Sequence, residues 1–318
     1  MRYSRLSVPR SSCDGSADRF GRVGSTQRRA PLCTLSNIYR AISPTDVRCR
    51  TAHSCRGAQT APVKSKTLRS RRTSAASGNQ LLAALPRRSE DKVLASCDQV
   101  DLRFATVLCV EGESVQRVYF PTDSVISLVT TLADGPRLEV GIIGNEGMLG
   151  TSALLGVNVS PQRAVVQGAG AALSMDAAVF RRHCERDSDL REVMNRYVHV
   201  LLEQLSQTAA CAAFHPVEGR LARWLLMTRQ RVGDDRFSLT HEFLAYMLGV
   251  RRAGVTHAAR SLHVRKLIDY RRGAITILDP SGLQKVSCAC FVRGNLIYRR
   301  TLGSARHRPR AAGSRLRS

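Results

Sequence analysis

The spacing of apolar residues along the chain changes twice. Residues 79–96 place apolar side chains at helical intervals among charged ones, whereas residues 104–175 form short β-rich runs separated by turn residues. From Ala177 onward the helical period returns. Short strands at nearly regular spacing predict an antiparallel roll or sandwich. The predicted strands are 107–110, 118–120, 125–129, 138–143 and 164–166.

A long helix is predicted between Asp189 and Ala213, because this stretch contains neither glycine nor proline. Apolar and small residues recur in it at alternating intervals of four and three, the spacing of a seam between two helices. The helix leads out of the predicted roll, so we expect it to pack on a second copy of the chain; packing on its own domain is the alternative. The expected seam residues are Met194, Val198, Leu201, Leu205 and Thr208, and Ala212 continues the pattern.

A winged helix-turn-helix is predicted beyond His215-Pro216 and a second amphipathic helix over 217–231. Thr240 can cap a helix over 241–248, and Gly249 supplies the turn. A further helix is expected from about Arg251 to His263, with its small and apolar residues facing inward. Two strands around an Arg-Arg-Gly turn follow, in the position of a wing.

The outward face of this last helix predicts contact with DNA. The first residues of a recognition helix point at base edges in the major groove, and arginine binds the two acceptors of guanine bidentately. Arg260 lies further along and suits a phosphate, as do the two wing arginines. A basic, solvated helix and hairpin of another small domain is the alternative. The expected DNA-binding residues are Thr240, Arg251, Arg252, Thr256, His257, Arg260, Arg271 and Arg272.

The net charge of +24 is concentrated at the two ends of the chain. Residues 1–78 carry 16 basic and 3 acidic residues, and residues 291–318 carry 8 arginines and no acid. Within the middle, residues 79–235 have a net charge of −3, whereas residues 236–273 have a net charge of +6. A near-neutral domain followed by a small basic one is typical of a sensor joined to a nucleic-acid reader.

The two ends keep no helix or strand period, and the first is too poor in apolar residues to offset its ordering entropy. We expect residues 1–78 to be a basic disordered tail or a gene start placed too early; a basic arm that adds non-specific nucleic-acid affinity is the alternative. Residues 291–318 are expected to be a second basic tail. No apolar run is long enough to cross a bilayer and no secretory signal is recognisable, so we expect a cytoplasmic protein without membrane contact.

The ten cysteines are irregularly spaced, and we expect mostly reduced thiols. Cys288 and Cys290 form a Cys-x-Cys pair just after the predicted wing. Two thiols cannot complete a four-ligand site, so no metal is expected. Inert cysteines are the interpretation that we prefer; oxidation sensing or a metal shared across a dimer are the alternatives.

Four strings of the chain carry a resemblance: 118–121, 144–150, 247–252 and 270–273. They resemble a branch of the Crp-Fnr superfamily of bacterial transcription regulators, and the similarity covers about residues 79–290. The resemblance implies an α+β fold with a cyclic-nucleotide-binding-like β-roll (79–186), a dimerisation helix (187–213) and a winged helix-turn-helix (214–290). It also implies a homodimer that binds a near-palindromic double-stranded DNA operator, contacts RNA polymerase and responds to an effector in the roll.

The expected effector residues depart from the pattern of the relatives that bind cyclic nucleotide. Those relatives use a Gly-Glu pair at the ribose and an Arg followed by Ser or Thr at the phosphate. Here Gly150 is followed by Thr151, and Arg163 is followed by Ala164. Cyclic AMP is therefore not expected, and no cofactor is certain. Glu146 is an alternative acceptor, and a surface ion pair is the alternative role of Arg163.

Two other classes of function are alternatives. The first is a cyclic-nucleotide-binding-like module, or a cysteine-based redox sensor, without sequence-specific DNA readout; the basic winged segment argues against it. The second is an enzyme, but the sequence has no Ser-His-Asp arrangement with a local motif, no Walker-type loop and no metal triad. We expect no catalysis.

Overall fold

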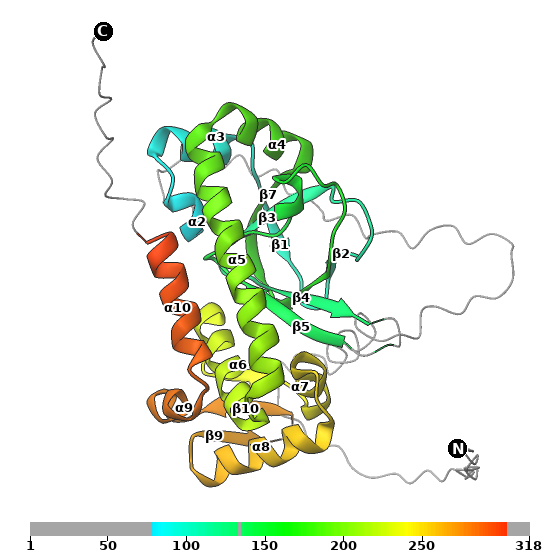
Figure 1. The fold of residues 1–318 in the computed structure, drawn as a ribbon, viewed down its shortest axis with the longest axis vertical. Helices are drawn as coiled ribbons and strands as arrows, with labels where there is room; N and C mark the ends of the chain where they lie inside the picture. Colours follow the sequence, from blue (N-terminus) through cyan, green and yellow to red (C-terminus); the bar gives the residue numbers. More distant parts are fainter. Residues whose placement is uncertain (1–77, 133–134, 136, 272, 304–318) are drawn as a thin grey trace, which may run out of the picture. The chain divides into compact units, whose positions relative to one another are not determined.

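The computed structural model describes residues 78–132, 135, 137–271 and 273–303 (Figure 1). All of these residues fall within one structural unit. The expectations for residues 1–77 and 304–318, and for Arg272, lie outside the described residues. Among the helices described, none is long and apolar enough to cross a membrane.

The helical segment at residues 79–96 is two helices rather than one. Asn79 caps the first, because its Oδ1 accepts hydrogen bonds of 3.1 Å from the backbone amides of Leu81 and Leu82. Pro86 interrupts the helical pattern and becomes the N-cap of the second helix, since proline has no amide hydrogen and disfavours a helical residue before it. The two helices are α2 (Gln80–Ala83) and α3 (Arg87–Ala95).

Two antiparallel sheets form the roll, and all five predicted strands are confirmed within one to three residues. One sheet has the order β1-β7-β3 and the other has the order β2-β6-β4-β5. The sequence analysis missed β1, which is mostly polar, and β7, which is rich in small residues of low strand propensity. The strands are β1 (Asp98–Leu102), β2 (Val107–Cys109), β3 (Arg117–Pro121), β4 (Val125–Thr131), β5 (Arg137–Ile143), β6 (Arg163–Gly168) and β7 (Gly170–Asp176).

Apolar side chains fill the space between the two sheets. Strand residues alternate between the two faces of a sheet, so every second residue of a strand points into the roll. The buried cluster draws on both sheets and on the loop before the short 3₁₀ helix η2 (Thr151–Ala153). Its buried members are Val100, Leu102, Tyr119, Ile126, Leu128, Ile143, Leu149, Ala164, Val166 and Ala172.

The long helix is confirmed as α5 (Ser188–Phe214), which follows α4 (Ala177–Arg186) (Figure 1). Aspartates cap both helices: Asp176 accepts from two amides of α4, and Asp187 accepts from the amide of Leu190. The first half of α5 is anchored on the roll through a second apolar cluster, to which it contributes Leu190, Val193, Met194, Tyr197 and Val200.

The C-terminal part has the winged helix-turn-helix order expected from the sequence. A three-stranded antiparallel sheet with the order β8-β10-β9 packs with four helices around a third apolar cluster, which also includes Val125 and Ile142 of the roll. The elements are α6 (Val217–Val232), β8 (Arg236–Ser238), α7 (His241–Leu248), α8 (Arg252–Val264), β9 (Ile268–Arg271), β10 (Ala274–Ile277) and α9 (Pro280–Val286).

The expectation that residues from 291 onward form a tail is wrong for residues 291–301, which belong to the helix α10 (Cys290–Thr301). This helix lies alongside α5 (Figure 1). Its C-terminal end packs Ile297, Tyr298 and Leu302 against the cluster between α5 and the roll. A short helix gains most of its stability from such packing, which an arginine-rich sequence does not reveal.

Candidate nucleic-acid interface

Local chemistry explains the turn between α7 and α8. The hydroxyl of Thr240 accepts a 3.1 Å hydrogen bond from the amide of Phe243 and so caps α7. Gly249 ends α7 with φ 61°, in the left-handed region that favours glycine. A Cβ on Gly249 would also lie 2.9 Å from Cδ1 of Leu138 on β5. Glycine is therefore required here both for the turn and for close packing on the roll.

The recognition helix α8 presents two different faces. Its inward face consists of Val255, Ala258, Ala259 and Leu262, each at most 2% exposed, as the sequence pattern predicts. Small alanines let α8 lie close to its neighbours in the domain core. The opposite face lines a shallow, open surface and consists entirely of exposed residues: Arg252, Ala253, Thr256, His257 and Arg260.

The other predicted DNA-binding residues surround this surface or lie outside the described residues. Arg251 is the exposed N-cap of α8. Arg271 is exposed at the end of β9, where its Nε lies 3.2 Å from a carboxylate oxygen of Asp269. Thr240 is only half-buried, but its hydroxyl already serves the cap of α7. Arg272 lies outside the described residues.

His241 is a residue of this surface that the sequence analysis missed. Its ring stacks on Tyr270 of the wing at a centroid distance of 4.2 Å, and its Nδ1 lies 3.0 Å from the hydroxyl of Thr256. That hydroxyl donates to the carbonyl of Arg252, so it accepts from Nδ1–H of the imidazole. Burial and the charge of Arg252 lower the pKa of His241, which favours the neutral ring. His241 thus joins α7, α8 and the wing, a link that no periodicity reveals.

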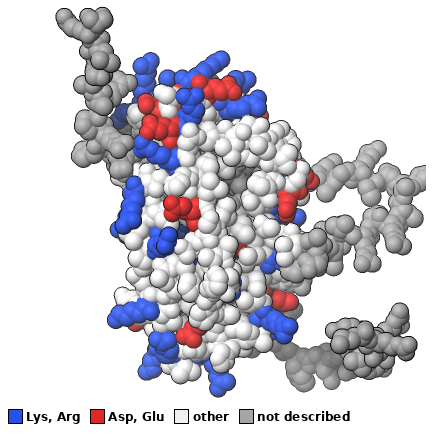
Figure 2. Space-filling view, viewed as in Figure 1, with Lys and Arg blue, Asp and Glu red and all other residues white. Residues whose placement is uncertain are grey.

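The charge of the surface agrees with this geometry. In the view of Figure 2, basic side chains lie around the lower end, where Figure 1 places α8 and the wing. Acidic side chains lie among the basic ones at both ends of this view. A basic surface around an exposed helix is the electrostatic footprint of a nucleic-acid reader.

The predicted effector residues lie in the loop before η2, at the start of η2 and at the start of β6. Gly150 has φ 99° and precedes η2, which begins at Thr151. Arg163 is half-buried at the start of β6, opposite Val129. Ala164 is fully buried within the apolar core of the roll. It therefore offers neither a hydroxyl nor a polar surface to a ligand.

Glu146 forms an ion pair with an arginine of α6. One of its carboxylate oxygens lies 2.6 Å from Nη2 and 2.8 Å from Nε of Arg231 on α6. These two side chains are 18% and 9% exposed. The hydroxyl of Tyr298 on α10 donates to the backbone carbonyl of Glu146. The loop that carries Glu146 thus holds the roll against α6 and α10.

A second polar contact joins the roll to α6 through Glu139 of β5. The indole Nε1 of Trp224 donates to one carboxylate oxygen at 2.7 Å, and the hydroxyl of Ser127 lies 2.6 Å from the other. Glu139 is 6% exposed, and its burial raises the pKa of the carboxyl from 4.5 to about 7, against the opposing effects of both hydrogen bonds. A titratable group therefore lies between the roll and the DNA-binding part.

Next to the predicted dimer seam, α5 carries a stripe of exposed residues, called here the exposed seam. Met194 is excluded because it is fully buried in the chain's own core, and Val198, Leu201, Leu205 and Thr208 are only half-buried. The exposed residues that alternate at intervals of four and three are Asn195, His199, Leu202, Ser206, Ala209 and Ala213. Of the predicted seam residues, Met194 lies on the side of α5 that packs against the roll.

Comparisons with known proteins agree with this architecture. Residues 100–187 match the cyclic nucleotide-binding domain family, and residues 219–286 match the Crp-like helix-turn-helix domain family. A CRP-like cAMP-activated global transcriptional regulator from Mycobacterium tuberculosis is 24% identical over 193 residues, which are 58% of this chain and 86% of that protein.

Two solved structures share the fold. One is a putative transcriptional regulator of the Crp/Fnr family from Eubacterium rectale, with a TM-score of 0.55 and 15% identity over 66% of this chain and 99% of that one. The other is FixK2 from Bradyrhizobium japonicum, with a TM-score of 0.51 and 14% identity over 61% of this chain and 98% of that one. With a β-roll, a long helix and a winged helix-turn-helix in this order, the chain belongs to the Crp-Fnr family of DNA-binding transcription regulators.

Proposed function

We propose that the chain acts as a homodimer that reads a two-fold symmetric DNA operator through α8. The observation that carries this proposal is the outward face of α8. Five adjacent positions on it are exposed, and three of them carry basic side chains, Arg252, His257 and Arg260. A helix with this face fits the major groove, and two such helices read half-sites about 34 Å apart, one turn of DNA.

The second copy packs along the exposed seam of α5 that is centred on Leu202. This side chain is 59% exposed, which is unusual for a leucine in the middle of a long helix. The seam continues toward the C-terminus with Ser206, Ala209 and Ala213, whose small side chains let two helices approach closely. The intervals of four and three match a helical pair of this kind.

The basic residues divide into two roles. Arg252, in the first turn of α8, reads base edges together with Thr256 and His257, because the N-terminal residues of a recognition helix reach the bases. Arg251 and Arg260, at or beyond the edge of this surface, bind phosphates, as do Arg271 and Arg272 of the wing. Thr240 contributes through the cap of α7.

The roll is the regulatory part, and its ligand is not cyclic AMP. The M. tuberculosis relative is cAMP-activated by its name, but here Ala164 is buried in apolar core and Glu146 is paired with Arg231. A ligand of the roll changes operator affinity by favouring one arrangement of the contacts between the roll and α6. We also propose that the protein acts in the cytoplasm, contacts RNA polymerase at its promoters and catalyses no reaction.

The test is a selection of full-length protein on random DNA, followed by titrations at several salt concentrations. We expect a two-fold symmetric motif. Arg252→Ala should lose about 1–3 kcal/mol of affinity for that motif and relax its specificity at one base pair. Arg260→Ala should weaken all sequences alike and lower the salt slope by about 1.

The matched control is Arg181→Ala, which removes the same charge from an exposed position on α4 of the roll. This variant should bind the motif as the wild type does. Unchanged affinity and an unchanged motif in the Arg252→Ala variant would refute the readout role of α8. Salt-sensitive binding without any enriched motif would contradict sequence-specific recognition.

A further inference from the structure

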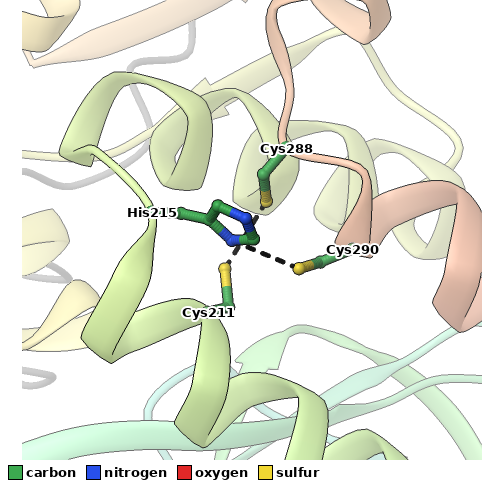
Figure 3. Close-up of side chains that lie close together, drawn as sticks. All are labelled: Cys211, His215, Cys288 and Cys290. Carbon is green, nitrogen blue, oxygen red and sulfur yellow. Dashed lines mark hydrogen bonds between the residues drawn. The ribbon is translucent and has the colours of Figure 1, made fainter.

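Four side chains that can ligate a metal meet at the C-terminal end of α5 (Figure 3). Cys211 and His215 are four residues apart at the end of this helix, a spacing that brings both to one face. Cys288 lies in the short segment between α9 and α10, and Cys290 is the first residue of α10. In Figure 3 the three thiols and the imidazole point toward one another from these two segments.

The distances between the four side chains fit a single ion. The Sγ atoms of Cys211 and Cys288 are 3.5 Å apart, and Sγ of Cys290 lies 3.4 Å from Nδ1 of His215. All four ligand atoms lie within 4.8 Å of one another. A tetrahedral zinc site with its usual bond lengths has sulfur atoms about 3.8 Å apart and sulfur and nitrogen about 3.5 Å apart. The sulfur distance is well above the roughly 2.05 Å of a disulfide.

The surroundings also suit a metal centre. Cys211 and Cys290 are 1% and 3% exposed, so water is largely excluded from these two thiols. The amide Nε2 of Gln207 donates a 3.0 Å hydrogen bond to Sγ of Cys290, a contact that orients and stabilises a thiolate ligand. Three thiolates around a divalent ion leave one negative charge, and the buried guanidinium of Arg220 donates a hydrogen bond to the carbonyl of Ala212, the residue after Cys211.

The backbone holds the Cys-x-Cys segment in place independently of any metal. The amide of Cys288 donates a 3.3 Å hydrogen bond to the carbonyl of Gly219 on α6. A Cβ on Gly219 would lie only 3.4 Å from that amide nitrogen, so the segment passes directly over the glycine. The ligands are therefore positioned by elements that fold for other reasons, which makes the site preorganised.

We propose that Cys211, His215, Cys288 and Cys290 bind one Zn²⁺ ion as a structural site. A Cys₃His set that supplies all four ligands from the protein is typical of closed, structural zinc sites, because no position remains for water or substrate. The close spacing of the ligand atoms leaves room for one ion rather than for an iron-sulfur cluster. The Cys-x-Cys pair supplies two of the four ligands, and the end of α5 supplies the other two, Cys211 and His215.

The ion would connect two points that are 77 residues apart in the sequence and that flank the whole winged domain. It would fasten the end of α5 to the start of α10, which packs back along α5 toward Glu146. The winged helix-turn-helix would then keep a fixed orientation relative to the long helix. The metal site itself stands or falls independently of the proposed function, because its test requires no DNA.

The test measures the metal content of the untagged, full-length chain, expressed with added zinc and purified anaerobically under reducing conditions. We expect one zinc per chain by mass spectrometry of the dissolved metal. Replacing it with Co²⁺ should give the intense visible bands of a tetrahedral thiolate site. The double variant Cys288→Ser/Cys290→Ser should lose one equivalent of zinc and these bands.

Matched variants separate this site from other thiols and from loss of folding. Cys97→Ser/Cys109→Ser removes two other half-buried cysteines and should keep the metal. Replacing all four cysteines before residue 78 with serine should also keep it. His215→Ala should lose the zinc, whereas His215→Cys should retain it, because cysteine restores a ligand at the same position.

Three results would overturn the proposal. The first is a wild-type chain without zinc that gives no tetrahedral cobalt spectrum. The second is full retention of the metal by Cys288→Ser/Cys290→Ser. The third is a disulfide between Cys211 and Cys288 in metal-free protein that was purified under reducing conditions.

Discussion

Replacing Glu139 with glutamine should remove a large part of the pH dependence of stability between about pH 4.5 and 7. Burial raises the pKa of this carboxyl from 4.5 to about 7. The folded state therefore favours the protonated form, and the stability that this group contributes is complete below about pH 4.5 and lost as the pH rises through about 7. At 1.36 kcal/mol per pKa unit, the loss amounts to about 3 kcal/mol.

Glutamine should behave as the protonated carboxyl does. Its amide oxygen can accept from Nε1 of Trp224, and its nitrogen can donate to the hydroxyl of Ser127, at the positions now 2.7 and 2.6 Å from the carboxylate. The charges of Arg231 and Arg223 lower the pKa of Glu139, but burial raises it by more. As the pH rises through this range, the free energy of unfolding of the Glu139→Gln variant should therefore increase by about 3 kcal/mol relative to that of the wild type.

Urea unfolding at a series of pH values and at constant protein concentration measures this difference. Trp224 is the only tryptophan of the chain and contacts Glu139 directly, so its fluorescence reports on the joint between the roll and α6. Subtracting the two curves cancels the contributions of the other carboxylates. Glu111→Gln, at an exposed position of the roll, should follow the wild type. A difference between wild type and Glu139→Gln that stays constant from pH 4.5 to 7.5 would refute the reasoning.

Two further predictions concern the dimer seam and the turn. Leu202→Glu places a charge at the centre of the exposed seam and should convert the dimer to a monomer in sedimentation velocity; Leu155→Glu, at an equally exposed leucine of the roll, should not. A Leu202→Glu variant that remains dimeric would contradict the seam. Gly249→Ala should lower the free energy of unfolding by about 1–2 kcal/mol for its left-handed backbone and by more for the contact with Leu138. Gly112→Ala shares the positive φ but has no neighbour within 4 Å, so equal losses in both variants would contradict a packing role of Gly249.

The winged helix-turn-helix was the most predictable part of the molecule, because the residues that define it lie close together in the sequence. The cap at Thr240, the left-handed Gly249 and the inward Val255, Ala258, Ala259 and Leu262 lie within about 25 residues of one another. Each feature acts through neighbouring backbone or through one turn of helix, so the sequence pattern alone placed α7, α8 and the wing. The roles of its arginines in DNA binding remain predictions.

Features of the fold that depend on packing were less visible. β1 and β7 carry few β-branched residues and form because they pair with each other, and β7 also pairs with β3. Helix α10 depends on its contacts with α5 and with the roll. The periodicity of α5 correctly predicted a long helix, but it could not tell the face that the roll covers from the face left exposed, and it therefore assigned the buried Met194 to the seam.

The sequence by itself determined the order of the roll, the long helix and the winged helix-turn-helix, because periodicity, caps and turn glycines are properties of short segments. Only the tertiary structure decided which distant residues meet. It paired Glu146 with Arg231, and it brought Cys211 and His215 to the Cys-x-Cys pair. Contacts between segments separated by many residues depend on how whole elements pack, and no local pattern encodes that packing.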